Sequence, residues 1–436
     1  MRLSGTTVVD SETVVEDGAV VVDGSEIAAV GPADELADRY PDHEHRAFDV
    51  VCPGFVQTHV HSVQSPGRGL ADDTDLFEWL EDHILPIEAE MTADELELAS
   101  TLSYVELLAH GTTCCVDHLT VDHSERAFEA AGEVGIRGVL GKVLMDRNAP
   151  AGLHEETDAG LAETRRLVER YHRSHDDRLR YAVTPRFTPT CSEACLRGAR
   201  EIADEYDRVR IHTHASEHES VLDHVTEERG MGDVEWLHEV GLTGEDVVLA
   251  HVILTSERER ALLAETGTHV TYCPSSNMKV GAGIAPIADY LDREINVALG
   301  NDGAPANNTL DPLAEMRQAT LLQKVAHRNP RTLPAETVFE MATRNGARAA
   351  GFDRVGRLEP GWKADVVGVR TDTSRGVPLH DVYSYLVYAA TGSDVVFSMV
   401  DGEVVVEEGV VTSVPTGELY RRAREAFEGR EWGGGA

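Results

Sequence analysis

The fold is decided by the stretch Pro53-Gly-Phe-Val-Gln-Thr-His-Val-His61. Its apolar residues predict a buried strand, and two histidines stand two residues apart at its end. Because side chains alternate between the two faces of a strand, His59 and His61 point to the same side, which is the interior in a closed barrel. They would then supply half of a metal site. Alone the pair is a weak signal, since two core or surface histidines give the same pattern.

Seven more apolar strands are expected downstream, each followed by a stretch rich in alanine, leucine, glutamate and arginine. With the first, the strand candidates are residues 54–61, 112–118, 136–142, 179–184, 208–214, 246–251, 268–273 and 295–302. Strands that alternate with helical stretches indicate a parallel α/β architecture. Eight such units over roughly 300 residues is the size of a (β/α)8 barrel. We therefore expect a TIM-like barrel over residues 53–352.

Both ends of the chain have the pattern of short strands. Residues 20–31 predict a hairpin with Asp23-Gly24 at its turn, and Asp401-Gly402 marks a similar turn near the other end. We expect residues 1–52 and 353–436 to form one small β-sandwich assembled from both termini. The glycine-rich end of the chain is expected to fray.

The composition narrows the choice of partners and location. The 436 residues carry a formal net charge of −38, which disfavours nucleic acid and anionic membranes as partners. Only four of the 39 basic residues are lysine, and this acid excess resembles proteins of salt-loving archaea. No apolar run approaches the roughly 20 residues of a membrane span. We expect a cytoplasmic protein whose six cysteines are free, buried thiols.

Residues of metal-ligand type recur where later strands end. The fifth, sixth and eighth strand candidates end on His214, His251 and Asp302. The C-terminal ends of the strands form the active-site face of this barrel. His212 shares a strand face with His214, so either could bind a metal; we favour His214, which lies nearer the strand end. His251 could be a ligand or could polarise the attacked substrate.

The donor set points to a catalytic metal. A buried carboxylate such as Asp302 is costly among imidazoles unless it is paired with a cation. Three histidines and a carboxylate that leave one position open are typical of a catalytic site, with zinc the first choice and iron the second. Glu217 follows His214 by three residues and could act as a general acid/base beside the metal. It could also be one solvated acid among many.

At this point the residues match a family. The chain resembles the amidohydrolase superfamily, in its deaminase and triazine-hydrolase-like branch, and most of all its 5′-deoxyadenosine, methylthioadenosine and S-adenosylhomocysteine deaminases. The resemblance covers nearly the whole chain. The matching stretches are Pro53-Gly-Phe-Val-Gln-Thr-His-Val-His61, Leu85-Pro-Ile-Glu88, His214-Ala-Ser-Glu217, Cys273-Pro-Ser-Ser-Asn277 and Gly300-Asn-Asp-Gly-Ala-Pro-Ala-Asn-Asn308.

The resemblance implies a site and a chemistry. It implies one zinc per subunit, held by the ligand set His59, His61, His214 and Asp302. It also implies that Asp302 accepts a proton from water, that Glu217 carries protons to a ring nitrogen, and that His251 stabilises the attacked centre. Relatives with two metals use a lysine at the end of strand four, where this chain has Thr184-Pro-Arg186. One metal is therefore expected.

Two further residues bear on the substrate. Glu88 matches the position that holds the ribose hydroxyls in methylthioadenosine-type deaminases, although it could be a helix-start acid. Arg186 departs from that pattern, which has a histidine there, and its Pro-Arg-Phe setting looks like guanine deaminases, as does the stretch around Arg147. An arginine there could hydrogen-bond a ring carbonyl or a ring nitrogen. Lys142 is interpreted as structural or substrate-facing.

Together these features predict a zinc-dependent deaminase of an adenine nucleoside that releases ammonia and the inosine analogue. The alternatives are a guanine deaminase, a triazine-type aminohydrolase or chlorohydrolase, and, from another class, a non-catalytic scaffold. Scaffolds would be expected to lose ligands, and all four are present here. Relatives often form dimers or tetramers, so a homo-oligomer is expected.

Overall fold

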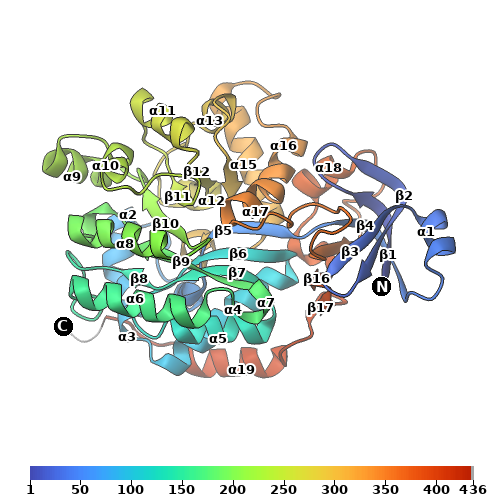
Figure 1. The fold of residues 1–436 in the computed structure, drawn as a ribbon, viewed down its shortest axis with the longest axis horizontal. Coiled ribbons are helices and arrows are strands. Elements are labelled where there is room, and N and C mark those ends of the chain that lie inside the picture. Colours follow the sequence, from blue (N-terminus) through green and yellow to red (C-terminus); the bar gives the residue numbers. More distant parts are fainter. Residues whose placement is uncertain (434–436) are drawn as a thin grey trace.

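The computed structural model describes residues 1–433 and contains two sheets (Figure 1). The larger is a closed parallel barrel with the strand order β13-β12-β11-β10-β9-β7-β6-β5-β14. Its strands are β5 (Phe55–His61), β6 (Thr112–His118), β7 (Arg137–Gly141), β9 (Leu179–Pro185), β10 (Arg210–Ala215), β11 (Val247–His251), β12 (His269–Tyr272), β13 (Val297–Leu299) and β14 (Asp302–Gly303), with β8 (Val143–Leu144) beside β9. The predicted barrel is confirmed.

The eighth predicted strand is split. Its first half, β13, pairs with β12, and its second half, β14, pairs with β5, which closes the barrel. Gly300 lies at the break, where an added Cβ would come within 2.8 Å of the His59 Cβ. A side chain at this position would therefore push against the first metal-ligand candidate.

Helices cover the outside of the barrel. The main ones are α4 (Ala93–Ala109), α5 (Glu125–Val134), α6 (Thr157–Tyr171), α8 (Glu193–Glu205), α9 (Glu219–Arg229), α10 (Asp233–Glu239), α11 (Glu257–Thr266), α13 (Ile287–Asp292), α15 (Pro312–His327) and α16 (Ala335–Met341). Their ends follow local rules: Ser256 caps α11 in a capping box with Glu259, and Gly267 ends it in the left-handed conformation.

The bottom of the barrel is plugged. Helix α17 (Arg344–Ala350) packs small side chains such as Ala347 against Val56 and other interior apolar residues of the strands. Gly346 allows this close approach, because a Cβ there would lie 2.7 Å from the Val56 Cβ. The barrel interior is therefore open only at the C-terminal ends of its strands.

The second sheet is built from both ends of the chain. Its strands are β1 (Arg2–Val8), β2 (Val14–Asp23), β3 (Glu26–Pro32), β4 (His45–Pro53), β15 (Val366–Val369), β16 (Val395–Val400), β17 (Glu403–Glu407) and β18 (Val410–Val411). They form one continuous sheet in which β4 pairs with β15. Both predicted hairpin turns are present, the second with Asp401 and Gly402 at positive φ.

The chain then returns to the barrel. Helix α19 (Thr416–Phe427) packs along α4, so the chain after the terminal sheet lies against the outside of the barrel (Figure 1). The predicted frayed end begins at Gly433, and residues 434–436 lie outside the described part of the chain.

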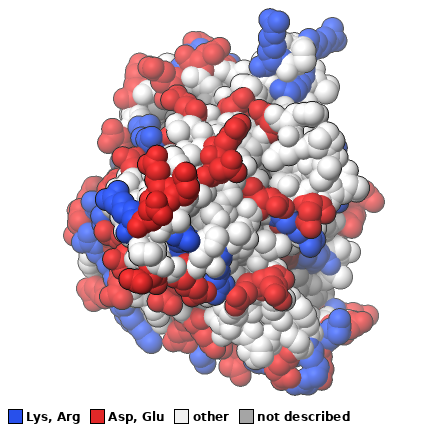
Figure 2. All heavy atoms as spheres, turned by 90° about the vertical axis from the view of Figure 1, so that its right-hand side faces the viewer, with Lys and Arg blue, Asp and Glu red and all other residues white. Residues whose placement is uncertain are grey.

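Acidic side chains are spread over the face at the terminal-sheet end of the molecule, with fewer basic ones between them (Figure 2). All six cysteines are buried and free, as predicted. Among the described helices, none combines the length and the apolar character that crossing a membrane requires.

Candidate active site

The predicted ligands meet at the open end of the barrel. His59 and His61 lie at the end of β5, His214 near the end of β10, His251 at the end of β11, and Asp302 at the start of β14. Ligand atoms of His59, His61 and Asp302 lie within 4.8 Å of one another, and so do those of His59, His214 and His251. The structure thus brings together five residues from four strands that are widely separated in the sequence.

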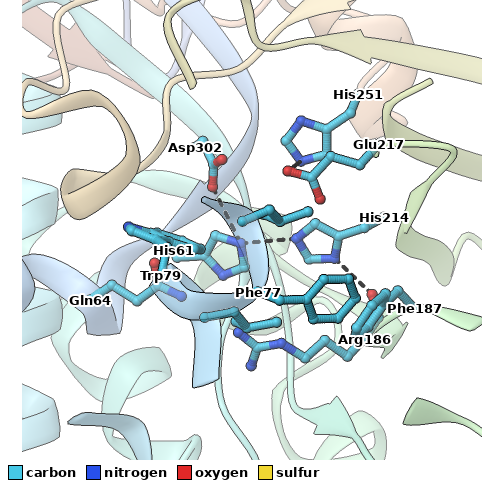
Figure 3. A pocket seen from close by; sticks show the side chains of 12 residues that line it. His61, Gln64, Phe77, Trp79, Arg186, Phe187, His214, Glu217, His251 and Asp302 are labelled. Carbon is cyan, nitrogen blue, oxygen red and sulfur yellow. Dashed lines mark hydrogen bonds and ion pairs between the residues drawn. The ribbon is translucent and has the colours of Figure 1, made fainter. Parts of the chain in front are cut away.

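Hydrogen bonds assign the ring protons of two histidines. His61 Nδ1 lies 2.7 Å from the His118 carbonyl oxygen, and His214 Nδ1 lies 2.7 Å from that of Arg186. A carbonyl only accepts, so each Nδ1 carries the proton and each Nε2 presents a lone pair. The two Nε2 atoms are 3.2 Å apart (Figure 3). Facing lone pairs repel one another, and a shared cation turns this contact into an attraction.

His59 is oriented by His212. His212 Nδ1 donates to the Val248 carbonyl oxygen at 3.0 Å, so its Nε2 accepts the Nδ1 proton of His59 at 2.8 Å. His59 Nε2 is then a buried lone pair with no hydrogen-bond partner among the described residues. This geometry gives His212 the role of an outer partner that fixes the His59 ring, a common arrangement around metal-bound histidines.

Asp302 supplies the carboxylate. Its Oδ1 lies 3.5 Å from the Nε2 atoms of both His59 and His61, and Ser276 donates to its Oδ2 at 2.6 Å. Burial raises the pKa of Asp302, and protonated His59 and His61 rings would hold that pKa well below its usual value; with both rings neutral, a bound cation has the same effect. The group is therefore ionised, as a metal ligand must be.

The donor set fits a divalent metal. Two ligands about 2.0–2.1 Å from one zinc ion at a tetrahedral angle lie about 3.3 Å apart, close to the 3.2 and 3.5 Å observed. Burial, and then repulsion from His59, lowers the pKa of His61 and of His214 well below 6.5, which keeps both rings in the neutral, ligating form. Nitrogen and oxygen donors without a thiolate are typical of catalytic zinc.

Glu217 and His251 stand beside the ligands. Glu217 Oε1 lies 3.8 Å from His251 Nε2, and His251 Nδ1 donates to Asn277 Oδ1 at 2.9 Å. Burial raises the pKa of Glu217, although His251 opposes the shift. A carboxyl group with a raised pKa is suited to taking up and releasing a proton near neutral pH. His251 Nε2 is buried without a hydrogen-bond partner in residues 1–433 and points at the same space.

The ligand candidates lie at the floor of a cavity (Figure 3). One wall is apolar and comes from the segment of α2 (Leu76–Glu78) and the π-helix η2 (Trp79–Ile84). Phe77 and Trp79 offer aromatic faces there, and Phe187 adds another. The Trp79 indole N–H is buried and has no acceptor within the described chain. Such a cavity, apolar with a few convergent polar groups, is typical of a small-molecule site.

The two predicted substrate residues pair with each other. Arg186 Nη1 donates to Glu88 Oε2 at 2.8 Å and Arg186 Nη2 donates to Glu88 Oε1 at 3.2 Å. Gln64 Nε2 donates to the same Oε1 at 2.8 Å. Arg186 and Gln64 border the cavity, whereas Glu88 lies behind them. The predicted contact of Glu88 with ribose hydroxyls stays a prediction. Arg186 and Gln64 already make three of the hydrogen bonds that this carboxylate can accept.

Lys142 and Arg147 lie outside the cavity lining. Lys142 is buried and bonds to Glu155 and to the Val143 carbonyl oxygen. Arg147 makes two 2.7 Å hydrogen bonds to Glu228. Both contacts have the form of structural ion pairs.

Sequence reasoning missed several residues of the site. Gln64 is a polar residue three positions after His61. This closeness to a ligand candidate could have indicated that it borders the site. His118 ends the second strand, and its ring centroid lies 4.7 Å from that of His214. The reasoning that singled out His214, His251 and Asp302 at the ends of their strands could also have found it. Trp79 left no such signal, because its place depends on how the π-helix packs over the barrel.

Comparison with known proteins identifies the family. The model of the amidohydrolase family matches residues 50–405, and a short match to an imidazolonepropionase-like composite domain of bacteria covers residues 18–42. The chain belongs to the amidohydrolase family. The predicted enzyme class, a metal-dependent hydrolytic deaminase, is thereby confirmed, and the scaffold alternative is not supported.

Several amidohydrolase relatives cover almost the whole chain. A 5-methylthioadenosine/S-adenosylhomocysteine deaminase of Syntrophobacter fumaroxidans is 39% identical over 414 residues, 94% of this chain and 92% of its own. A 5′-deoxyadenosine deaminase of Methanothermobacter thermautotrophicus is 39% identical over 402 residues, 91% and 90% of the two chains. The solved structure of an adenosine deaminase from Xanthomonas campestris with bound zinc superposes with a TM-score of 0.90, at 29% identity and 97% coverage of both chains.

Proposed function

We propose that this amidohydrolase is a zinc-dependent deaminase of an adenine nucleoside of the 5′-deoxyadenosine, methylthioadenosine or S-adenosylhomocysteine type. It would replace the amino group on the purine ring with oxygen and release ammonia. The observation that carries the proposal is the set of imidazole lone pairs facing Asp302 at the floor of a cavity, with Glu217 and His251 at its edge. The named activities of the relatives supply the substrate class.

Each residue of the site has a separate role in the proposed reaction. His59, His61, His214 and Asp302 would hold a zinc ion, which would supply the Lewis acidity needed to make water a nucleophile at neutral pH. The free lone pairs of Asp302 accept the proton that the water loses. Glu217 delivers a proton to the ring nitrogen next to the attacked carbon, takes up the second proton of the water from the new oxygen, and passes it to the leaving ammonia. Asp302 then returns its proton to Glu217. His251 stabilises charge that develops on the new oxygen.

One zinc ion per subunit is proposed, with iron as the second choice. The support is the one cluster of metal-ligand atoms, around His59, found among residues 1–433, together with the absence of a lysine at the end of β9 and the bound zinc in the Xanthomonas structure. Metal analysis of the purified protein tests this: one equivalent per chain is expected, and two equivalents would contradict it. His59→Asn should lose the metal, because it removes one lone pair and the bond to His212.

A second candidate is a guanine deaminase or a related enzyme that acts on a ring bearing a carbonyl. Arg186 favours it, because this side chain borders the cavity and keeps N–H groups that Glu88 does not use. Triazine-type hydrolysis on the same scaffold is the third possibility. Arg186 would serve either substrate as a hydrogen-bond donor.

Ammonia release from a substrate panel tests the choice. The panel is 5′-deoxyadenosine, S-adenosylhomocysteine, adenosine, guanine and a chlorotriazine, in high salt with zinc. We expect turnover of the adenosine compounds. Turnover of guanine alone would overturn the nucleoside assignment and leave the metal site and the roles of Glu217 and His251 in place.

The remaining proposals concern the setting of the enzyme. We propose a cytoplasmic location, supported by six free cysteines, and a homo-oligomer. Light scattering after gel filtration in high salt would give the mass of the particle. A mass of 47.5 kDa would contradict the oligomer.

A further inference from the structure

The outer face of helix α15 (Pro312–His327) differs in charge from the chain as a whole. Acidic residues make up 77 of the 436 residues, yet none occurs between Glu315 and Glu336. The same stretch holds four basic residues, which are Arg317, Lys324, Arg328 and Arg331. A basic segment attracts carboxylates, and at a net charge of −38 every copy of this chain carries a large excess of them.

Apolar side chains also lie open on this face. Leu321 and Val325 are 39% and 74% exposed, and Val325 is the most exposed large apolar side chain of residues 1–433. Positions four apart lie one above the other on a helix, so Arg317, Leu321 and Val325 form a single stripe along α15. One exposed apolar residue is ordinary, but an apolar pair bordered by arginine has the composition of a protein interface.

The charged groups of this surface are not paired with one another. Arg317, Arg328 and Arg331 are exposed and form no ion pair within the described part of the chain. Glu336 and Glu340 on α16 form none there either, although α16 packs beside α15 (Figure 1). Opposite charges thus stand on neighbouring elements, and each keeps its capacity to pair with a group from outside.

The loop that carries Arg328 and Arg331 is held in place. Lys324 Nζ donates to the Leu333 carbonyl oxygen at 3.2 Å, and the Thr320 hydroxyl donates to the same oxygen at 2.6 Å. A loop that is already fixed loses little conformational entropy when a partner docks on it. The arginines are therefore presented on a preorganised surface.

We propose that the outer face of α15, the loop after it and α16 form the interface through which two copies of this chain build a twofold dimer. This rests on the proposed homo-oligomer and names the surface that builds it. A twofold axis places the same patch of both copies face to face. Leu321 and Val325 then cover their counterparts, and the arginines of each copy meet Glu336 and Glu340 of the partner subunit.

Charge reversal on each half of the patch tests the pairing. Arg328→Glu with Arg331→Glu, and Glu336→Arg with Glu340→Arg, should each halve the particle mass in light scattering after gel filtration, because like charges then face each other. An equimolar mixture of the two double variants should regain the full mass, since their patches are complementary. About 0.5 M KCl suits the measurement, because it screens charges beyond about 4 Å and leaves contact pairs intact.

Val325→Asp tests the apolar centre. It should halve the mass in the same measurement, because it would bury an unpaired carboxylate in the contact. Two controls make matched changes elsewhere. Arg422→Glu with Arg424→Glu reverses two exposed arginines of α19 that form no ion pair in residues 1–433, and Val410→Asp changes a 53% exposed apolar side chain. Both controls should keep the full mass.

The outcomes separate this interface from the oligomer itself. A mass of 47.5 kDa for the unaltered protein would overturn the homo-oligomer and the interface together. An oligomer whose mass the α15 and α16 variants leave unchanged would overturn the interface alone. If the two double variants dissociate but do not recombine in the mixture, arginine and glutamate do not pair across the axis and the proposed contact is wrong.

Discussion

Asp233 Oδ2 accepts the backbone N–H of Ser216 at 2.7 Å, one residue before Glu217. Its Oδ1 accepts from the Thr188 hydroxyl at 2.6 Å, so one buried carboxylate ties the loop after β9 to the loop after β10. Ser216 has a φ of 48°, a left-handed conformation that costs energy in a non-glycine residue unless its surroundings hold it. Asp233 thus fixes the turn that aims Glu217 into the cavity.

Replacing Asp233 should therefore affect turnover from outside the cavity. Asp233→Ala should lower kcat about tenfold, equivalent to about 1.4 kcal/mol of barrier, with KM and zinc content near wild type. Asp233→Asn should retain most activity, because its amide oxygen can accept from Ser216 while its NH2 donates to the Thr188 hydroxyl. Steady-state kinetics and metal analysis check this. Full activity of the alanine variant would show that the bonds from Ile253 and Leu254 to the Ser216 carbonyl oxygen suffice.

Asp233 also predicts a pH dependence of stability. Burial raises its pKa to about 6. Because this folded-state pKa lies above the unfolded value near 3.8, the associated stability is present below pH 3.8 and is lost as the pH rises through 6. An asparagine side chain does not titrate, so Asp233→Asn should gain about 3 kcal/mol relative to wild type between pH 4 and pH 8. Urea unfolding at several pH values measures the difference. A constant difference would mean that Asp233 titrates normally.

Glu217→Gln separates proton transfer from metal binding. The variant should keep one zinc ion and lose turnover by about 10²-fold or more, the usual size of a general acid/base effect. In the wild type, Glu217 must hold a proton before it can deliver one, and burial raises its pKa, so the alkaline limb of kcat/KM should report this group. The limb should vanish in the variant. Near-wild-type rates for Glu217→Gln would remove this residue from the proposed chemistry.

The barrel and the metal-ligand cluster could be predicted because both follow from local pattern. Strand candidates 112–118 and 246–251 agree with β6 and β11 to within one residue, and the strand ends of a closed barrel must converge. The split of the eighth strand into β13 and β14 was not visible, since Asp302 takes a φ of 63° that no periodicity encodes.

The pairing of Glu88 with Arg186 could not be predicted for a different reason. The two residues are 98 positions apart, and their contact depends on how α3 packs over the barrel mouth. The resemblance predicted a ribose contact for Glu88 from the motif Leu85-Pro-Ile-Glu88 alone. Arginine in place of histidine at position 186 changes what surrounds the Glu88 carboxylate. The ion pair with Arg186 is therefore a contact that the motif around Glu88 could not reveal.

The excess of acidic residues predicts that the enzyme is stabilised by salt. At a net charge of −38, repulsion among carboxylates destabilises the folded chain, and ions screen it: the Debye length falls from about 10 Å at 0.1 M to about 3 Å at 1 M. Salt also weakens favourable surface pairs such as Arg165–Glu205, but an exposed pair contributes at most about 1 kcal/mol. The repulsion should therefore dominate, and Tm should rise by more than about 5 °C between 0.1 M and 2 M KCl. Sucrose at equal osmolality is the control, since it cannot screen charge. An equal rise in sucrose, or no rise in KCl, would contradict a role for the acidic surface.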